Sequence, residues 1–170
     1  MIFKATLDKL AKGITIGTTM LFAAIIVLQK VLFTGGGHVT AIMVTLLLLS
    51  IYLGIYLFRP TAYEIRSQQV IIHRPLRNKI LERVNISKAE LLGPSALRHT
   101  IRTFGNGGLF GYYGKFSNAK IGNMTWYATN RANAVLLEMT GGDKIVITPD
   151  KAEAFLNALS SPDRLSENFD

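Results

Sequence analysis

The sequence predicts two adjacent membrane-spanning helices followed by a small, mainly-β domain that ends in one helix. Three observations predict this order of elements. Two long apolar runs occupy the first third of the chain, alternation of apolar and polar residues begins after position 60, and one apolar stripe with helical spacing lies near the end. A chain of 170 residues has room for both helices and for one domain of ordinary size.

The second apolar run, residues 39–58, is the strongest of these signals. It contains no charged side chain, and as a helix it is long enough to cross a hydrocarbon core of about 30 Å. The earlier run, residues 13–33, carries Gln29 and Lys30 near its end, where a lysine can extend to the lipid headgroups. Only residues 34–38 separate the two runs, which suits a tight turn between antiparallel helices.

Two other interpretations of these runs have to be weighed. A helical pair buried in a soluble core would need a much larger protein around it. A cleaved signal peptide would need a small-x-small cleavage site that ends the first run, and we do not expect cleavage there. We therefore expect a transmembrane hairpin.

The positions of lysine and arginine predict how the hairpin is oriented. Lys4, Lys9 and Lys12 lie in the segment 1–12, and four arginines fall between positions 59 and 77, whereas the connection between the runs carries neither residue type. Basic residues are enriched on the cytoplasmic side of membrane proteins. We therefore expect both chain ends and the domain in the cytoplasm, and the absence of cysteine agrees with this compartment.

The part after residue 60 is expected to form seven or eight short antiparallel strands, because apolar and polar residues alternate between clusters of turn residues. The expected strands cover residues 61–67, 69–75, 79–86, 98–104, 109–116, 121–129, 133–139 and 144–148.

A helix is expected over residues 148–162. Thr148 suits its cap, Pro149 its first position and Asp150 the positive end of its dipole. The apolar stripe of this helix consists of Ala152, Phe155, Leu156 and Leu159. Pro162 is expected to end the helix, and residues 163–170 are expected to be a flexible polar tail.

Two stretches resemble the bacterial PH-like (pleckstrin-homology-like) domain family. They are TAYEIRSQQVIIHRP followed by NKILERVNIS, and NAVLLEMTGGDKIVITPDKAEAFLNAL. The glycine and aromatic stretch between them, with WYATNRANAV after it, is similar to membrane-anchored members. The resemblance implies a PH-like domain over residues 59–162, built as a bent seven-stranded sheet or small barrel and capped by the C-terminal helix. Domains of this family are often found next to transmembrane helices, and the resemblance brings no catalytic residue with it. Together with the two apolar runs, it leads us to expect a location in the bacterial inner membrane.

The glycine-rich stretch RTFGNGGLFGYYGKF, residues 102–116, is expected to be a β-hairpin. Phe110 stands where a dinucleotide-binding loop would need glycine, and no Ser or Thr follows Gly114 at the spacing of a P-loop. Asn106-Gly107 is predicted to form a two-residue turn. Gly111 and Gly114 are predicted to allow a bent strand or the close approach of another chain segment.

Aromatic residues in the same stretch support a second interpretation. Phe110, Tyr112, Tyr113 and Phe116 include neighbours in sequence, which cannot all point into one core. These four residues are therefore candidates for a protein-binding surface.

The net charge of +8 is concentrated next to the second apolar run. Residues 59–102 contain nine Lys or Arg against three Glu. Basic side chains near an anionic membrane surface can bind lipid headgroups, and a simple positive-inside bias explains the same charge equally well. Nucleic-acid binding is not expected, because no recognition motif accompanies the charge. The candidate lipid contacts are Arg74, Arg77, Lys79, Arg83, Arg98 and Arg102.

No enzymatic site is expected. The chain has no cysteine, and His38, His73 and His99 are far apart with no carboxylate at ligand spacing, so neither a catalytic residue nor a cofactor or metal site is predicted.

We expect a membrane-anchored protein that associates with itself or with a protein partner near the bilayer, with contact to anionic lipid. The alternative is a small-molecule sensor that binds its ligand at the mouth of the barrel.

Overall fold

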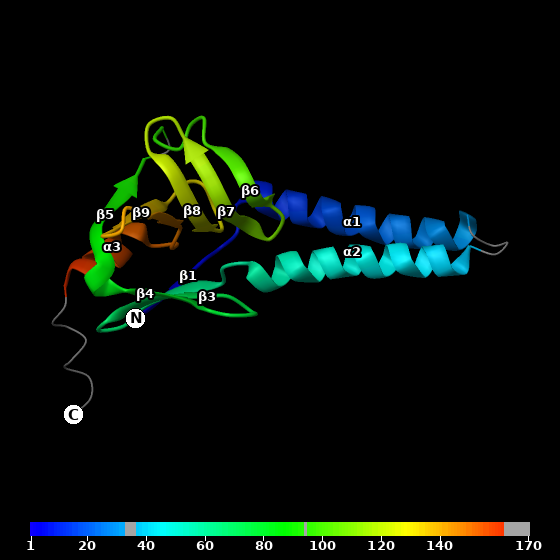
Figure 1. Ribbon diagram of the computed structural model, residues 1–170, viewed down its shortest axis with the longest axis horizontal. Coiled ribbons are helices and arrows are strands. Elements are labelled where there is room, and N and C mark those ends of the chain that lie inside the picture. The colour runs from blue at the N-terminus through cyan, green and yellow to red at the C-terminus, as the bar shows by residue number, and fades with distance from the viewer. Residues whose placement is uncertain (33–36, 94, 162–170) are drawn as a thin grey trace, which may run out of the picture.

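The computed structural model describes residues 1–32, 37–93 and 95–161, without the side chains of residues 30–32. Helices α1 (Lys9–Leu32) and α2 (His38–Phe58) lie side by side and project from one end of the β-domain (Figure 1). Both are long and apolar enough to cross a membrane, and almost none of the residues in their apolar spans are buried. A helical pair enclosed in a soluble core is therefore not what the structure shows.

Several expectations fall on residues that the structure does not describe. They concern most of the turn expected over residues 34–38, the side chain of Lys30, the helix stop at Pro162 and the tail 163–170.

Polar side chains join the two long helices to each other. The hydroxyl oxygens of Thr19 and Tyr52 are 2.7 Å apart, and the Thr45 hydroxyl donates a hydrogen bond of 3.1 Å to Gln29 Oε1. The Phe22 ring also packs on Tyr52, with 6.0 Å between the ring centroids. Hydrogen bonds of this kind between apolar helices help to fix their pairing in a lipid environment.

The domain contains two sheets that do not close into the expected small barrel. The first has the order β1-β2-β3-β4, and the second has the order β5-β9-β10-β8-β7-β6. The strands are β1 (Ile2–Lys4), β2 (Ala62–Ile65), β3 (Gln69–His73), β4 (Lys79–Glu82), β5 (Ile86–Leu92), β6 (Ile101–Gly108), β7 (Gly111–Asn118), β8 (Gly122–Ala128), β9 (Ala134–Met139) and β10 (Lys144–Ile147).

Two predictions about the strands are wrong, and one strand was not predicted at all. The segment 79–86 is divided by a 3₁₀ turn, Arg83–Asn85, into β4 and the start of β5. Strand β1 was not expected, because its partner β2 lies beyond both long helices in the sequence. The sheet is not entirely antiparallel, since the β9–β10 hairpin places β10 beside β8 in the same direction.

The prediction that Asn106-Gly107 forms the β6–β7 turn is also wrong. Both residues are paired within β6, and the chain turns at Leu109 and Phe110 instead. Phe110 has a φ of 57°, and the Asn106 side-chain amide donates to the carbonyl oxygens of Leu109 and Gly111 at 2.5 and 2.7 Å. Asn106 therefore supports the turn from the neighbouring strand, as short amide side chains often do.

Gly114 lies at a close approach between two strands of the same sheet. Gly105 and Gly114 face each other across the β6–β7 pair, with φ values of 108° and 121°. A Cβ atom on Gly114 would lie 2.8 Å from the Gly105 Cα and would overlap the Phe104 carbonyl oxygen. Only residues without a side chain fit this crossing of the two strands.

The six-stranded sheet has a buried hydrophobic core on each face. One face packs against the four-stranded sheet and α3 (Ala152–Ser160), and Phe155 of α3 is fully buried there. The opposite face carries Trp126 stacked on Phe116, with 4.5 Å between ring centroids, and it is covered by Leu97 and by Ala11 at the start of α1. Residues 1–12 therefore supply both a strand and part of a core.

Helix α3 presents the predicted apolar stripe to the core but begins later than expected. Its first residue is Ala152, and Thr148 does not cap it. Thr148 is fully buried, and its hydroxyl accepts a hydrogen bond of 2.8 Å from the Thr129 N–H. The Asp150 carboxylate accepts hydrogen bonds from the backbone N–H and hydroxyl of Thr6, which tie α3 to the N-terminal segment.

Gly114→Ala is expected to lower the free energy of unfolding by more than about 2 kcal/mol, because alanine disfavours the positive φ and its Cβ meets backbone atoms. Fluorescence of Trp126, the single tryptophan, reports the loss of the core in a denaturant titration. Gly141→Ala is the control, since nothing lies within 4 Å of its Cβ position, and it should leave stability unchanged. Equal effects of the two substitutions would contradict this account of the crossing.

Tyr63→Phe is expected to change how stability depends on alkaline pH. The Tyr63 hydroxyl donates to the Tyr127 carbonyl at 2.6 Å and accepts from the Thr148 N–H at 3.2 Å, and burial raises the pKa of Tyr63 from 10.0 to about 12. Because the pKa of the folded state lies above that of the unfolded chain, the stabilisation is complete below pH 10 and is lost as the pH rises toward 12.

The variant should therefore be less stable than the wild type by about 1–3 kcal/mol at neutral pH, since it leaves buried partners unpaired. Its stability should fall less steeply between pH 10 and pH 12. Denaturant titrations at several pH values would measure both effects, and parallel pH profiles of the two proteins would contradict the role of the Tyr63 hydroxyl.

Candidate interaction surfaces

The β6–β7 turn docks against both long helices. The Phe110 ring packs edge-on against Tyr52 and Tyr56 of α2, at centroid distances of 5.1 and 5.4 Å. The Phe110 N–H donates a 2.9 Å hydrogen bond to the hydroxyl of Thr15 in α1. We call this contact, made by Phe110 with Thr15, Tyr52 and Tyr56, the hairpin junction.

Neighbouring residues extend the hairpin junction. The Tyr113 hydroxyl donates a hydrogen bond to the carbonyl oxygen of Ile55, and burial raises the pKa of Tyr113. The Arg59 guanidinium lies over the rings of Tyr56 and Phe110, at 4.4 and 5.6 Å from their centroids. Such cation–π contacts strengthen where water is excluded, so Arg59 holds the end of α2 to the turn.

Asp8 connects the start of α1 to the domain. Its carboxylate accepts a hydrogen bond of 2.7 Å from the Ala11 N–H, which is the geometry of a helix N-cap, and its own N–H donates to the Thr129 carbonyl. The Tyr112 hydroxyl lies 3.2 Å from both carboxylate oxygens, and burial together with the Asp8 charge raises the pKa of Tyr112 to about 12. The first turn of α1 is therefore fixed in the domain.

The four aromatic residues proposed as a protein surface are buried within the chain. Phe110 and Tyr113 belong to the hairpin junction and its extension, whereas Tyr112 and Phe116 lie in the core that Trp126 occupies. Their exposed fractions do not exceed 9%. The large exposed aromatic side chain of this stretch is Phe104 of β6, at 78%.

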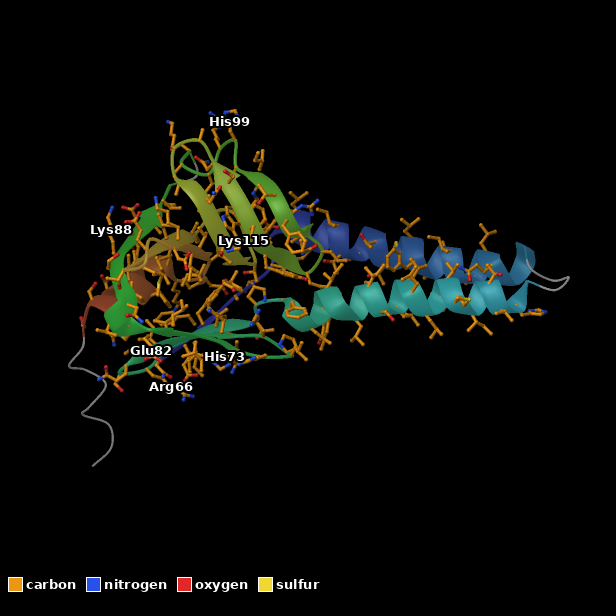
Figure 2. The ribbon with its side chains drawn as sticks, in the orientation of Figure 1. Arg66, His73, Glu82, Lys88, His99 and Lys115 are labelled. Atoms are coloured by element: carbon orange, nitrogen blue, oxygen red, sulfur yellow. The ribbon has the colours of Figure 1, made fainter. Side chains whose placement is uncertain are left out.

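The six basic residues proposed as lipid contacts do not gather in one place. Arg83 donates hydrogen bonds to backbone carbonyls of Arg66, Ser67 and Leu159, so it links the β2–β3 turn to the end of α3. Figure 2 shows Arg66 and Glu82 at the end of the domain away from the long helices. Arg83 therefore has a structural role far from the expected bilayer.

Only two of the six share a turn beside the long helices. Arg74 packs over the rings of Phe58 and Tyr127, at 5.8 and 5.4 Å, and its Nε donates to the Arg77 carbonyl at 2.8 Å. The other basic candidates are dispersed, with Lys79 on β4, Arg98 in the loop before β6, and Arg102 beside Gly107 on β6.

His73 has a carboxylate partner that its sequence neighbours did not suggest. Its Nε2 lies 2.9 Å from Glu64 across the β2–β3 pair, and the Arg66 guanidinium donates to the same carboxylate at 2.8 Å. The hydrogen bond from Arg66 is the main reason why the pKa of Glu64 is lowered. His99 lies in a distant loop (Figure 2). Among the described residues, no group of three or more His, Cys, Asp or Glu side chains could hold a metal ion.

A groove of about 1090 Å³ lies between β1 and α3. One wall is the strand Ile2–Lys4, and the other is formed by residues of α3 and its ends, including Lys151, Ala154, Asn157 and Ala158. Figure 1 shows β1 and α3 in the part of the domain that lies away from the free end of the hairpin. We call this hollow the β1–α3 groove.

The backbone of β1 offers hydrogen-bonding groups to the groove. Met1 and Ile65 exchange two backbone hydrogen bonds of 2.8 Å. In an antiparallel pair, alternate residues direct their peptide groups toward and away from the partner, so Ile2 and Lys4 direct theirs away from β2. The Lys4 carbonyl accepts from the Asp150 N–H at 3.0 Å, and both Ile2 and Lys4 line the groove.

The sequence matches the family model of the bacterial PH domain over residues 61–162. This chain belongs to the bacterial PH domain family. In this PH domain protein, the matched part runs from β2 through α3, so β1, α1 and α2 lie outside it. No curated protein and no solved structure matches the chain significantly.

Sequence reasoning missed the residues that join the PH domain to the long helices, although one of them carries a signal. Asp8 stands directly before an apolar helical run, which is the usual place of an N-cap residue. Thr15 and the β1 edge carry no comparable signal, because their partners Phe110 and β2 are remote in sequence.

Phe110→Ala is expected to loosen the hairpin relative to the PH domain, because it removes the ring contacts with Tyr52 and Tyr56. The chain has no cysteine, so spin labels can be placed at Met43 of α2 and at Val84 of the domain, which are 66% and 85% exposed. Pulsed electron paramagnetic resonance should show a broader distribution of the distance between them.

The matched control is Phe104→Ala on the neighbouring strand, which removes a phenyl ring that is 78% exposed. It should leave the distance distribution narrow. A narrow distribution in the Phe110 variant as well would show that the turn is not what orients the domain.

Proposed function

We propose that this bacterial PH domain protein is a non-enzymatic adaptor that is anchored in the inner membrane and binds an extended polypeptide segment in its β1–α3 groove. The helical hairpin would be the anchor, since α1 and α2 have the length and composition of membrane spans. Basic residues at both ends of the hairpin support a cytoplasmic position for the PH domain and both chain ends. The occupant would be a protein partner or a second copy of the chain.

The single observation that carries this proposal is the β1–α3 groove. A free strand edge offers main-chain hydrogen bonds to an added strand, and the adjacent helix supplies contacts that distinguish one side chain from another. Ala154 and Ala158 leave room for a chain to approach α3, and Asn157 offers an amide. Lys4 and Lys151 favour an occupant with acidic side chains, because these two basic side chains outnumber the one carboxylate, Asp150, among the residues that line the groove.

The rigid link to the hairpin supports the same proposal. An adaptor benefits from a fixed orientation, because an ordered partner site loses less conformational freedom when it binds. The hairpin junction and Asp8 provide this order. Figure 1 shows α3, which forms one wall of the groove, on the side of the domain away from the long helices. The small-molecule alternative would need the mouth of a barrel, and the two sheets do not close into one.

A photoactivatable amino acid placed at Ala154 or Asn157 of the full chain in its native membrane should capture one defined polypeptide. At Glu153, which is on the same helix but does not line the groove, the same amino acid should capture little. The second variant Ala154→Arg should abolish capture from Asn157 by filling the groove, whereas Glu153→Arg should not.

Mass spectrometry of the cross-linked peptides identifies the partner segment and the position it occupies. Equal capture at all three positions, or capture that Ala154→Arg does not reduce, would contradict the proposed groove. Capture of this chain itself from the groove would make the protein a self-assembling adaptor.

A further inference from the structure

The β3–β4 turn, residues 74–78, lies directly against the end of α2. The Leu76 N–H donates a 3.0 Å hydrogen bond to the carbonyl oxygen of Leu57, which is in the last turn of the helix. This bond supplies a partner to one of the carbonyls that a helix end leaves without one. It also places Leu76 at the same level along the helix axis as the final residues of α2.

The turn is held in shape by its own side chains. The Arg74 N–H donates to the Asn78 side-chain oxygen at 3.2 Å, and the Arg74 Nε donates to the Arg77 carbonyl at 2.8 Å. The Arg74 guanidinium also packs over the Phe58 ring at 5.8 Å. The position of the turn beside α2 is therefore fixed from two sides.

Leu76 is not used by the core of the domain. Its exposed fraction is 55%, and Phe58, the last residue of α2, is exposed to 46%. Pro75 and Arg77, its neighbours in the turn, are also exposed. An apolar tip flanked by basic side chains is the composition of segments that enter the boundary between headgroups and acyl chains.

We propose that the β3–β4 turn inserts into the cytoplasmic surface of the bilayer, with Leu76 among the upper acyl chains and Arg77 bound to lipid phosphate. The occupant of this surface is a lipid bilayer because the turn is continuous with the end of α2. This inference rests on the proposed membrane anchoring of the hairpin. It gives the PH domain a second contact with the membrane besides the helical hairpin.

The test uses single cysteines in the full chain, labelled with an environment-sensitive fluorophore and placed in nanodiscs of phosphatidylethanolamine and phosphatidylglycerol. Three positions are compared: Leu49 in the middle of α2, Leu76 in the turn, and Val84 at 85% exposure on the domain. Three quenchers are used. Two are lipids that carry a nitroxide, either near the bilayer centre or near the headgroup, and the third is iodide in the aqueous phase.

We expect the Leu49 label to be quenched by the deep nitroxide, the Leu76 label by the shallow nitroxide, and the Val84 label by iodide alone. If the Leu49 label behaves as expected but the Leu76 label is quenched like the Val84 label, the insertion of the turn is refuted and the membrane anchor stands. If the Leu49 label is quenched by iodide alone, the proposed membrane anchor itself fails.

A charge variant tests the role of Arg77 separately. Arg77→Gln, compared with Lys79→Gln on β4, should lower the shallow quenching of the Leu76 label at least twofold in discs with anionic lipid. The loss should be smaller in discs of zwitterionic lipid alone, because the phosphate of a neutral headgroup attracts a guanidinium less strongly. An equal effect of the two variants would overturn the contact between Arg77 and lipid phosphate.

Discussion

The structure depends on the docking of one turn between two long helices. Phe110 adopts a φ of 57°, a conformation that costs a bulky residue on the order of 1–3 kcal/mol. Its ring contacts with Tyr52 and Tyr56 and its hydrogen bond to Thr15 offset that cost. Phe110 is followed directly by β7. The contact of Phe110 with α1 and α2 therefore fixes the six-stranded sheet relative to the helical hairpin without an intervening linker.

A second constraint comes from the order in which the chain enters the domain. Strand β1 precedes α1 and pairs with β2, which follows α2, so the helical hairpin is an insertion between two paired strands. It is not a separate module joined by one linker. Both of its ends are consequently tied to the domain, at Asp8 through Thr129 and at Leu57 through Leu76. These two attachments restrict the tilt of the helical hairpin relative to the domain, which a single covalent connection cannot do.

The elements that depend on local patterns could be predicted from the sequence. The two apolar helices, most strands and the apolar stripe around Phe155 follow from period and composition alone, and the family could be identified by resemblance. The elements that depend on remote partners could not. Strand β1 is only three residues long, too short to show an alternating pattern. The sequence of β10 does not indicate whether the neighbouring strand runs parallel or antiparallel to it.

The glycine-rich stretch shows why local turn signals can mislead. Asn106-Gly107 has the composition of a two-residue turn, and an isolated hairpin would favour it there. In the folded chain the facing pair of Gly105 and Gly114 allows the two strands to continue past that point, and the turn forms where Phe110 meets the helices. Likewise, the aromatics expected on the surface are buried. Phe110 and Tyr113 contact the long helices, and Tyr112 and Phe116 lie in the core around Trp126, which no strand pattern reveals.

The four-stranded sheet connects the two proposed surfaces to each other. Its first strand, β1, forms a wall of the groove, and its last two strands carry the turn that contacts α2. Cross-strand pairing holds β1, β2 and β3 in one register, so the groove cannot tilt relative to the turn without breaking backbone hydrogen bonds. A segment bound in the groove would therefore be held at a fixed angle to whatever surface the hairpin and the turn define.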